Sequence, residues 1–164
     1  MASFQFRGLE EYARNLQKIG GNTKEICGAG VYAMADVVAN AIRRNIQALP
    51  AEPDSEGVMA WRQERKARLT ISEKEGLENG FGISPMQNDK GYWNVKLGFE
   101  GYNDVKTKKY PKGQPNALIA RSIESGSTVR EKTPFIRPAV KTAEQDAVTA
   151  ATTAIDKKIY SLVK

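Results

Sequence analysis

The side chains that most often carry catalysis are nearly absent from this sequence. Its 164 residues include no histidine and a single cysteine, Cys27. Ser–His and Cys–His nucleophilic pairs and most zinc sites need an imidazole, so these chemistries are excluded. A lone cysteine forms no intrachain disulfide, which favours the cytosol as the place of synthesis. We expect Cys27 to be a small buried residue, and we expect no catalytic residues, no metal ligands and no cofactor.

Glycine and carboxylate patterns give no stronger chemical signal. Gly76, Gly80 and Gly82 have the wrong spacing for a dinucleotide fingerprint, and no phosphate-binding loop with Gly-Lys-Ser/Thr occurs. The carboxylate pairs, Glu10 with Glu11 and Glu73 with Glu75, lie in polar stretches, where we expect them to be solubilising. A carboxylate hydrolase stays open as a third hypothesis; it requires an activity that is lost when one such pair is mutated.

Positive charge is the clearest chemical feature. The net charge is +6, and the most basic window is a loop-like stretch rich in proline and glycine, here called the basic loop, with the lysines Lys106, Lys108, Lys109 and Lys112. Such a loop favours an acidic protein surface or nucleic acid as a partner, although exposed lysines are often only solvated. No apolar signal segment or membrane span is expected, because polar residues interrupt the most apolar helix candidate.

Two helices are predicted in the first third of the chain. Residues 8–19 form a short amphipathic pattern, which Gly20 and Gly21 should end, and Asn22 with Glu25 resembles a capping box. A long helix over 23–49 then ends at Pro50. Its apolar stripe is predicted to be Val31, Met34, Ala35, Val38, Ala41, Ile42, Ile46 and Leu49.

The middle of the chain predicts a charged excursion and a hairpin. Residues 51–75 are read as a surface segment with a short helix over 58–69, tethered by Trp61, Leu69 and Ile71. Alternating apolar residues over 80–87 and 91–99, with a turn signal at 88–91, predict a β-hairpin with a bulge or longer loop. A short helix over 116–125 should end at Gly126.

Two prolines near the last third define a predicted hinge. Pro134 and Pro138 flank Phe135, Ile136 and Arg137, and because proline disfavours a continuous helix we expect an extended segment there. The last helix is expected to begin at Pro138. Its apolar stripe is predicted to be Val140, Ala143, Ala147, Ala151, Ile155, Ile159 and Leu162.

Several short segments, in this order, resemble one protein family. They are Gly8-Leu9-Glu10-Glu11-Tyr12, Gly76-Leu77 leading to Phe81-Gly82-Ile83, Val95-Lys96-Leu97-Gly98-Phe99, Ile123-Glu124-Ser125-Gly126-Ser127 and Pro134-Phe135-Ile136-Arg137-Pro138-Ala139. The chain resembles the head–tail joining and tail-completion proteins of tailed bacteriophages, typified by gene product ten of HK-type lambdoid phages and distantly similar to the lambda minor tail protein Z. The charged segment 51–75 departs from the family pattern.

The resemblance implies an α+β fold in which long helices pack on a small antiparallel sheet, within a single domain over 1–164. It further implies a ring-forming subunit, expected to be hexameric, in the virion neck or tail after assembly in the host bacterial cytoplasm. The implied partners are further copies of the chain, head–tail adaptor or head-completion proteins, and tail terminator or tail tube proteins. DNA in the channel is a further candidate, and no membrane is expected.

The first hypothesis is therefore a structural virion protein without catalytic residues. Its interface candidates are Lys106, Lys108, Lys109, Lys112, Glu124, Phe135, Ile136 and Arg137. Phe135 and Ile136 can equally dock the last helix into the subunit's own core, and Arg137 is expected to pair with Glu124 or with a carboxylate of the next subunit. The runner-up, from another class, is a basic nucleic-acid-binding module, motivated by the +6 charge.

Overall fold

The computed structural model describes residues 8–104, 106 and 109–164. They form an α+β fold of six helices and two pairs of short antiparallel strands, as the sequence predicted. In chain order these elements are α1 (Leu9–Gly21), α2 (Thr23–Ala48), α3 (Asp54–Glu64), α4 (Ile71–Gly80), β1 (Phe81–Ile83), β2 (Gln87–Asp89), β3 (Tyr92–Asn94), β4 (Leu97–Phe99), α5 (Asn116–Ser125) and α6 (Ile136–Val163).

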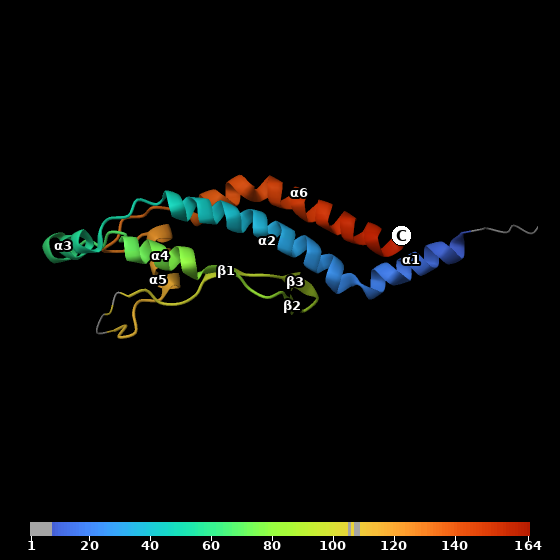
Figure 1. Cartoon of the computed structure of the whole chain (residues 1–164), viewed down its shortest axis with the longest axis horizontal. Helices are drawn as coiled ribbons and strands as arrows, with labels where there is room; N and C mark the ends of the chain where they lie inside the picture. The colour runs from blue at the N-terminus through green and yellow to red at the C-terminus, as the bar shows by residue number, and fades with distance from the viewer. Residues whose placement is uncertain (1–7, 105, 107–108) are drawn as a thin grey trace, which may run out of the picture.

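Two long helices, α2 and α6, lie side by side and antiparallel along the molecule (Figure 1). At one end Lys158 of α6 contacts Glu25 of α2 at 2.6 Å, and at the other the Asn45 side chain donates to the Phe135 carbonyl at 2.8 Å. The buried residues of α6 are alanines spaced four apart: Ala139, Ala143, Ala147 and Ala151. Small side chains at this spacing let the two backbones approach closely along one face.

The hydrophobic core lies at one end of this helix pair. The largest fully buried side chains are Phe135, Ile42, Ile46, Leu77 and Ile119, which come from α2, α4, α5 and the start of α6. Figure 1 shows α4, α5 and β1 gathered beside the C-terminal half of α2, while α1 extends away at the opposite end. The rest of the α2–α6 pair therefore forms an arm that projects from the core.

The predicted hairpin exists but is interrupted. β1 pairs with β4, placing Phe81 opposite Phe99, and β2 pairs with β3, placing Gln87 opposite Asn94. Three residues separate β1 from β2 but only two separate β3 from β4, so one extra residue in the first strand shifts the register. The turn at Lys90 and Gly91 has φ of 55° and 96°, and positive φ at both central residues is what a type I′ turn requires.

The 51–75 segment is organised differently from the prediction. Instead of one helix over 58–69, α3 begins after Pro53 and ends at Arg65, whose φ is 56°, and a separate helix, α4, begins after Thr70. Thr70 and Glu73 form a capping box that was not predicted from the sequence. Of the three predicted tethers, only Leu69 packs against the core.

Carboxylates neutralise part of the positive charge in the 51–75 segment, at Arg68. The Arg68 guanidinium contacts Glu52 at 2.9 Å and Glu64 at 3.3 Å, and the Arg65 guanidinium lies over the Trp61 ring, 5.9 Å from its centroid. Backbone bonds between Glu52 and residues Leu69 and Ile71, both 2.9 Å, close the base of the segment. These contacts hold the excursion together, while Arg62, Arg65 and Lys66 stay exposed.

The junction between the first two helices also differs from the prediction. Gly20 and Gly21 do not end α1; the helix runs through Gly21, and only Asn22 separates it from α2. Asn22 makes no side-chain cap, and its amide instead donates to the Lys18 carbonyl at 2.8 Å. The predicted capping box at Asn22 is therefore wrong. The predicted end of α1 at the glycines is also wrong, because glycine lowers helix propensity by about 1 kcal/mol without forbidding the helical conformation.

The last helix begins two residues before Pro138. Ile136 and Arg137 are helical, and Pro138 is the third residue of α6, so the prediction of an extended segment through Arg137 is wrong. The first-turn N–H groups of a helix have no partner within that helix, so proline removes no bond there.

Parts of the predicted apolar stripes are exposed. Met34 and Val140 were expected on packed faces, yet they are 39% and 43% exposed. The apolar face of α1 is more open still, and none of its residues is buried. Cys27 is half-buried, less enclosed than expected.

Helix α2 is long and apolar enough to cross a membrane by length and composition alone, with a mean hydropathy of 1.2 over its best window. Core helices of non-membrane proteins pass the same test, and the C-terminal half of α2 supplies much of the core here.

The alanine seam generates the first testable prediction. Ala143→Leu should lower the free energy of unfolding by about 1–3 kcal/mol, because a larger side chain does not fit a closely packed core and Ala143 is 5% exposed within it. Urea unfolding followed by circular dichroism measures this. Gln145→Leu, on the exposed side of the same helix, is the matched control; equal losses in both variants would contradict close packing at the seam.

Candidate functional site

The carboxylate of Glu124 binds the start of α6. It accepts hydrogen bonds from three successive backbone N–H groups: Phe135 and Ile136 at 2.8 Å, and Arg137 at 3.1 Å. Phe135, the residue before α6, has no side-chain cap of its own. A carboxylate from α5 therefore satisfies N–H groups that would otherwise lack partners at the N-terminus of α6, where the helix dipole also favours negative charge.

Burial and hydrogen bonding act on Glu124 in opposite directions. Burial of the side chain raises its pKa, whereas the N–H groups of Ile136, Phe135 and Arg137, with the Arg137 guanidinium, lower it. The net pKa lies below its ordinary value of 4.5. The carboxylate is therefore ionised at neutral pH and interacts with the positive end of α6.

Arg137 contacts Glu124 mainly through its backbone. The guanidinium Nε lies 3.6 Å from the carboxylate, and the Arg137 side chain is 70% exposed, whereas that of Glu124 is 8% exposed. The predicted pairing within the subunit thus exists, but an ion pair with one partner so exposed contributes little stability. Most of the guanidinium surface is available to another molecule.

Phe135 and Ile136 pack into the subunit's own core, which is one of the two predicted alternatives. Phe135 is 2% exposed and its ring lies 6.1 Å from that of Phe99, edge to face. Ile136 is half-buried and packs against the same core. The segment before them is tied back to α5 by a bond from the Thr133 N–H to the Ile123 carbonyl at 2.8 Å.

A buried ion pair holds the connector between α5 and α6. Arg130, within this connector, donates to both carboxylate oxygens of Glu73 on α4, at 3.0 and 2.9 Å, and both side chains are less than 10% exposed. This pair was not predicted from the sequence, and the prediction that Glu73 is solubilising is wrong. Breaking a buried pair costs about 3–5 kcal/mol, which makes this contact a fixed point of the connector.

The basic loop is only partly described. Lys106, Lys109 and Lys112 are exposed, and Lys108 lies outside the described residues. The Lys109 ammonium lies 5.5 Å from the centre of the Tyr110 ring. These lysines belong to the segment between β4 and α5, and the structure does not bring them together with the residues around Glu124.

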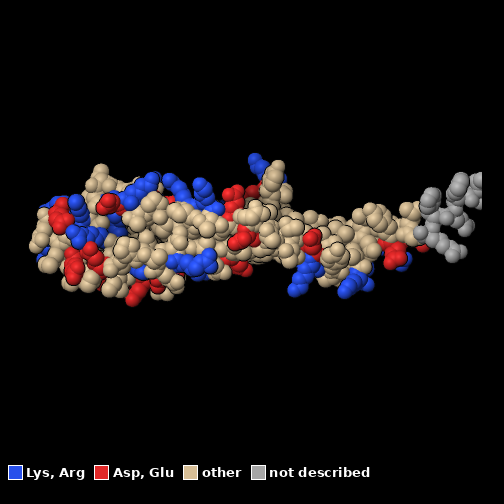
Figure 2. All heavy atoms as spheres, turned by 90° about the horizontal axis from the view of Figure 1, so that it is seen from above, with Lys and Arg blue, Asp and Glu red and all other residues tan. Residues whose placement is uncertain are grey.

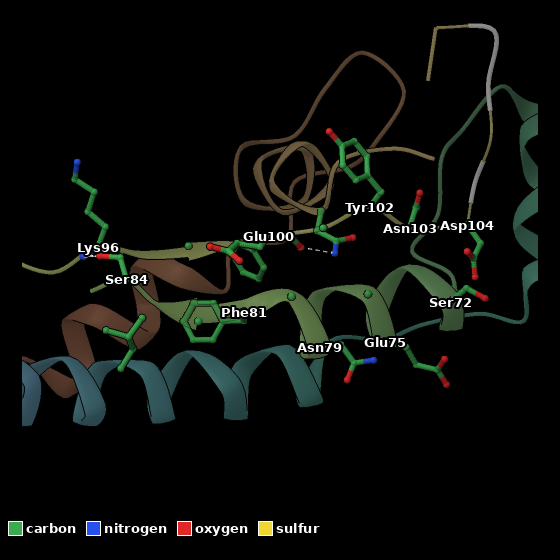
Figure 3. Close-up of a pocket in the computed structure, with 18 residues that line it drawn as sticks. Ser72, Glu75, Asn79, Phe81, Ser84, Lys96, Glu100, Tyr102, Asn103 and Asp104 are labelled. Carbon is green, nitrogen blue, oxygen red and sulfur yellow. Dashed lines mark hydrogen bonds between the residues drawn. The ribbon is translucent and has the colours of Figure 1, made fainter. Parts of the chain in front are cut away.

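A polar hollow of about 820 Å³ lies between α4, the β1–β4 pair and the segment after β4. Figure 3 shows Ser72, Glu75 and Asn79 on α4, with Tyr102 and Asp104 on the facing segment. Gly80 is required here, because a Cβ would lie 2.3 Å from the Glu100 carbonyl oxygen.

This hollow does not unite a predicted carboxylate pair. Glu75 lines it, whereas Glu73 is bound to Arg130. Within residues 8–104, 106 and 109–164, no group of three or more Asp, Glu, Cys or His side chains is placed to hold a metal ion.

Comparisons with known proteins assign no role to these features. No family model matches the chain, and no curated protein or solved structure matches it. The resemblance to phage neck and tail proteins therefore stays a prediction, which depends on the short segments quoted above. Two of them, Ile123–Ser127 and Pro134–Ala139, contain the two sides of the Glu124 cap.

The cap predicts a pH-dependent stability. Glu124→Gln should lower the free energy of unfolding by about 2 kcal/mol at pH 7, because a neutral amide accepts these N–H bonds poorly and presents its own N–H groups to them. A carboxyl whose folded pKa is lowered stabilises the fold above its unfolded pKa and loses that contribution as pH falls. The difference between wild type and variant should therefore shrink below pH 4.5, the ordinary value for this carboxyl.

Urea unfolding at several pH values measures this effect, with two comparison variants. Glu131→Gln changes an exposed carboxylate of the connector and should cost less than about 0.5 kcal/mol. Arg137→Ala removes the exposed guanidinium while keeping the backbone N–H, and should cost less than about 1 kcal/mol. A loss in Arg137→Ala as large as in Glu124→Gln would show that the side-chain ion pair, not the backbone cap, holds α6.

Proposed function

We propose that the chain is a structural virion protein that joins or completes the tail at the head–tail interface of a tailed bacteriophage, acting as a subunit of a ring. The observation that carries this proposal is the cap between Glu124 and the start of α6, because its two sides are the most specific segments of the family resemblance and have a mechanical role. The cap fixes the direction in which a 28-residue helix leaves the core.

The shape and surface of the subunit support the same role. The α2–α6 arm projects from the core (Figure 1). Several large apolar side chains on α1, α2 and α6 are exposed. Exposed apolar surface that recurs along one molecule is typical of a subunit that is buried by its neighbours. The proposed partners are further copies of the chain and the proteins above and below it in the neck.

The nucleic-acid alternative has less support. Figure 2 shows Lys and Arg interspersed with Asp and Glu over the visible face, not gathered in one basic surface. Arg68 and Arg130 form ion pairs with carboxylates. The three basic-loop lysines that the structure describes lie in one irregular segment.

Removal of the protein tests the joining role directly. In a phage or prophage that encodes this chain, deletion of its gene should yield separate filled heads and tails in negative-stain micrographs, and expression of the wild-type chain in trans should restore joined particles. Glu131→Gln should restore them as well as wild type. Joined, infectious particles in the absence of the protein would overturn the proposal.

Salt-dependent DNA binding separates the two candidate functions. For a structural subunit, we expect weak binding to duplex DNA, with the same salt dependence in a basic-loop variant (Lys106, Lys109 and Lys112 to Gln) and in a matched variant (Lys18, Lys157 and Lys164 to Gln). Both variants lose three positive charges, and all six side chains are exposed. Steep salt dependence that is lost only in the basic-loop variant would favour DNA contact, because each released counterion contributes to the slope. Fluorescence anisotropy at several salt concentrations provides the measurement.

A further inference from the structure

Most of the apolar face of helix α1 is exposed among the residues that the structure describes, although Ile19 at its C-terminal end is half-buried and the helix contacts α6 there. Leu9, Tyr12 and Leu16 recur at helical spacing and are 61%, 64% and 52% exposed. None of the α1 residues is buried, although the helix is strongly amphipathic in sequence. An amphipathic helix gains most of its stability from packing of its apolar face, so we expect another surface to cover this one.

A groove of matching character lies between α2 and the N-terminal half of α6, beside the core. It has a volume of about 600 Å³, and its apolar lining comes from Met34 and Val38 of α2 and from Ile136, Val140 and Val148 of α6. Three of these side chains, Met34, Val140 and Val148, are 39–49% exposed. We call this surface the α2–α6 groove.

The charges beside the two surfaces are complementary in one orientation. Along α1 the order is acidic then basic, from Glu10 and Glu11 to Arg14 and Lys18. Along the groove the order is basic then acidic, from Arg137 and Lys141 to Glu144, over a similar number of residues. A helix laid parallel to α6 therefore places opposite charges together, and the reversed helix places like charges together.

The chain's own α1 lies elsewhere. It extends beyond the C-terminal end of α6, while the groove lies along the N-terminal half of that helix (Figure 1). The separation from Val148 to Tyr160 alone is about 18 Å at 1.5 Å per residue. Asn22, the single residue between α1 and α2, leaves no linker with which α1 could fold back in this conformation.

We propose that α1 of one copy lies in the α2–α6 groove of a second copy, parallel to its α6. The two surfaces are different, so the contact is heterologous and can continue from copy to copy until a ring closes. Closure into a neck ring rests on the proposed function, whereas the contact between copies does not. Arg137, exposed at the edge of the groove, would contact the acidic start of the neighbour's α1.

Disulfide trapping between differently tagged chains tests this contact. In a Cys27→Ser background, one chain carries Leu16→Cys and the other Val148→Cys, and the two purified proteins are mixed and oxidised. The expected product is a mixed dimer, identified by its two tags on a non-reducing gel. The control replaces Val148→Cys by Asp146→Cys, which is exposed but lies on another side of α6. It should yield about tenfold less product, because a disulfide requires Cα atoms within about 7 Å.

A charge-exchange experiment provides the second test of this contact. Lys141→Glu in the groove chain should reduce the mixed dimer several-fold, and Glu11→Lys in the α1 chain should restore it if the helices are parallel. Equal yields with Val148→Cys and Asp146→Cys would overturn the proposal. A chain with both Leu16→Cys and Val148→Cys that forms only an internal disulfide would also overturn it, by showing that α1 occupies its own groove.

Disulfide trapping tests the contact between copies and the gene deletion tests the neck role, so either proposal can fail while the other stands. If heads and tails separate in the deletion but no mixed dimer forms, the neck role stands and this contact is wrong. If the mixed dimer forms but particles without the protein are joined and infectious, the contact stands and the neck role is wrong.

Discussion

The fold depends on one carboxylate that bridges two helices. Glu124 is fixed at the end of α5, whose Ile119 and Ile123 are buried in the core, and it receives three N–H groups from the start of α6. The Glu73–Arg130 pair holds the connector between these helices against α4. The direction of α6 is thus determined at its first turn, and the packing of its alanine face against α2 follows from that direction.

Long periodic patterns and strong stop signals could be read from the sequence. The bounds of α2 were predicted to within one residue because its apolar stripe is long and Pro50 follows it. The end of α5 at Gly126, where φ is 76°, was predicted for a similar reason. The start of α6 was predicted two residues too late, because Pro138 was assigned to the first helical position, whereas it is the third residue of the helix.

The contacts that form the candidate site were harder to predict, for a physical reason. Arg130 and Glu73 are 57 residues apart in sequence, and nothing local to either indicates that they meet. The Thr70–Glu73 capping box did carry a local signal for α4, but this helix was not predicted; Gly76 and Gly80 lie within it, and glycine has low helix propensity. Gly80 serves a tertiary contact with the Glu100 carbonyl, which local propensity does not encode.

Apolar periodicity predicts that a face is covered, not which chain covers it. Leu9, Tyr12, Met34 and Val140 were read as packing residues, and a single copy leaves each of them exposed. This discrepancy is the expected result when part of the burial needed by a helix is supplied by another molecule, because intrachain and interchain apolar contacts use the same side chains. Arg137 takes part in both the internal cap and the outer surface. Its N–H group donates to Glu124, and its guanidinium lies at the edge of the α2–α6 groove. A change in the angle of α6 at the cap would therefore also move the surface that we propose a neighbouring copy contacts.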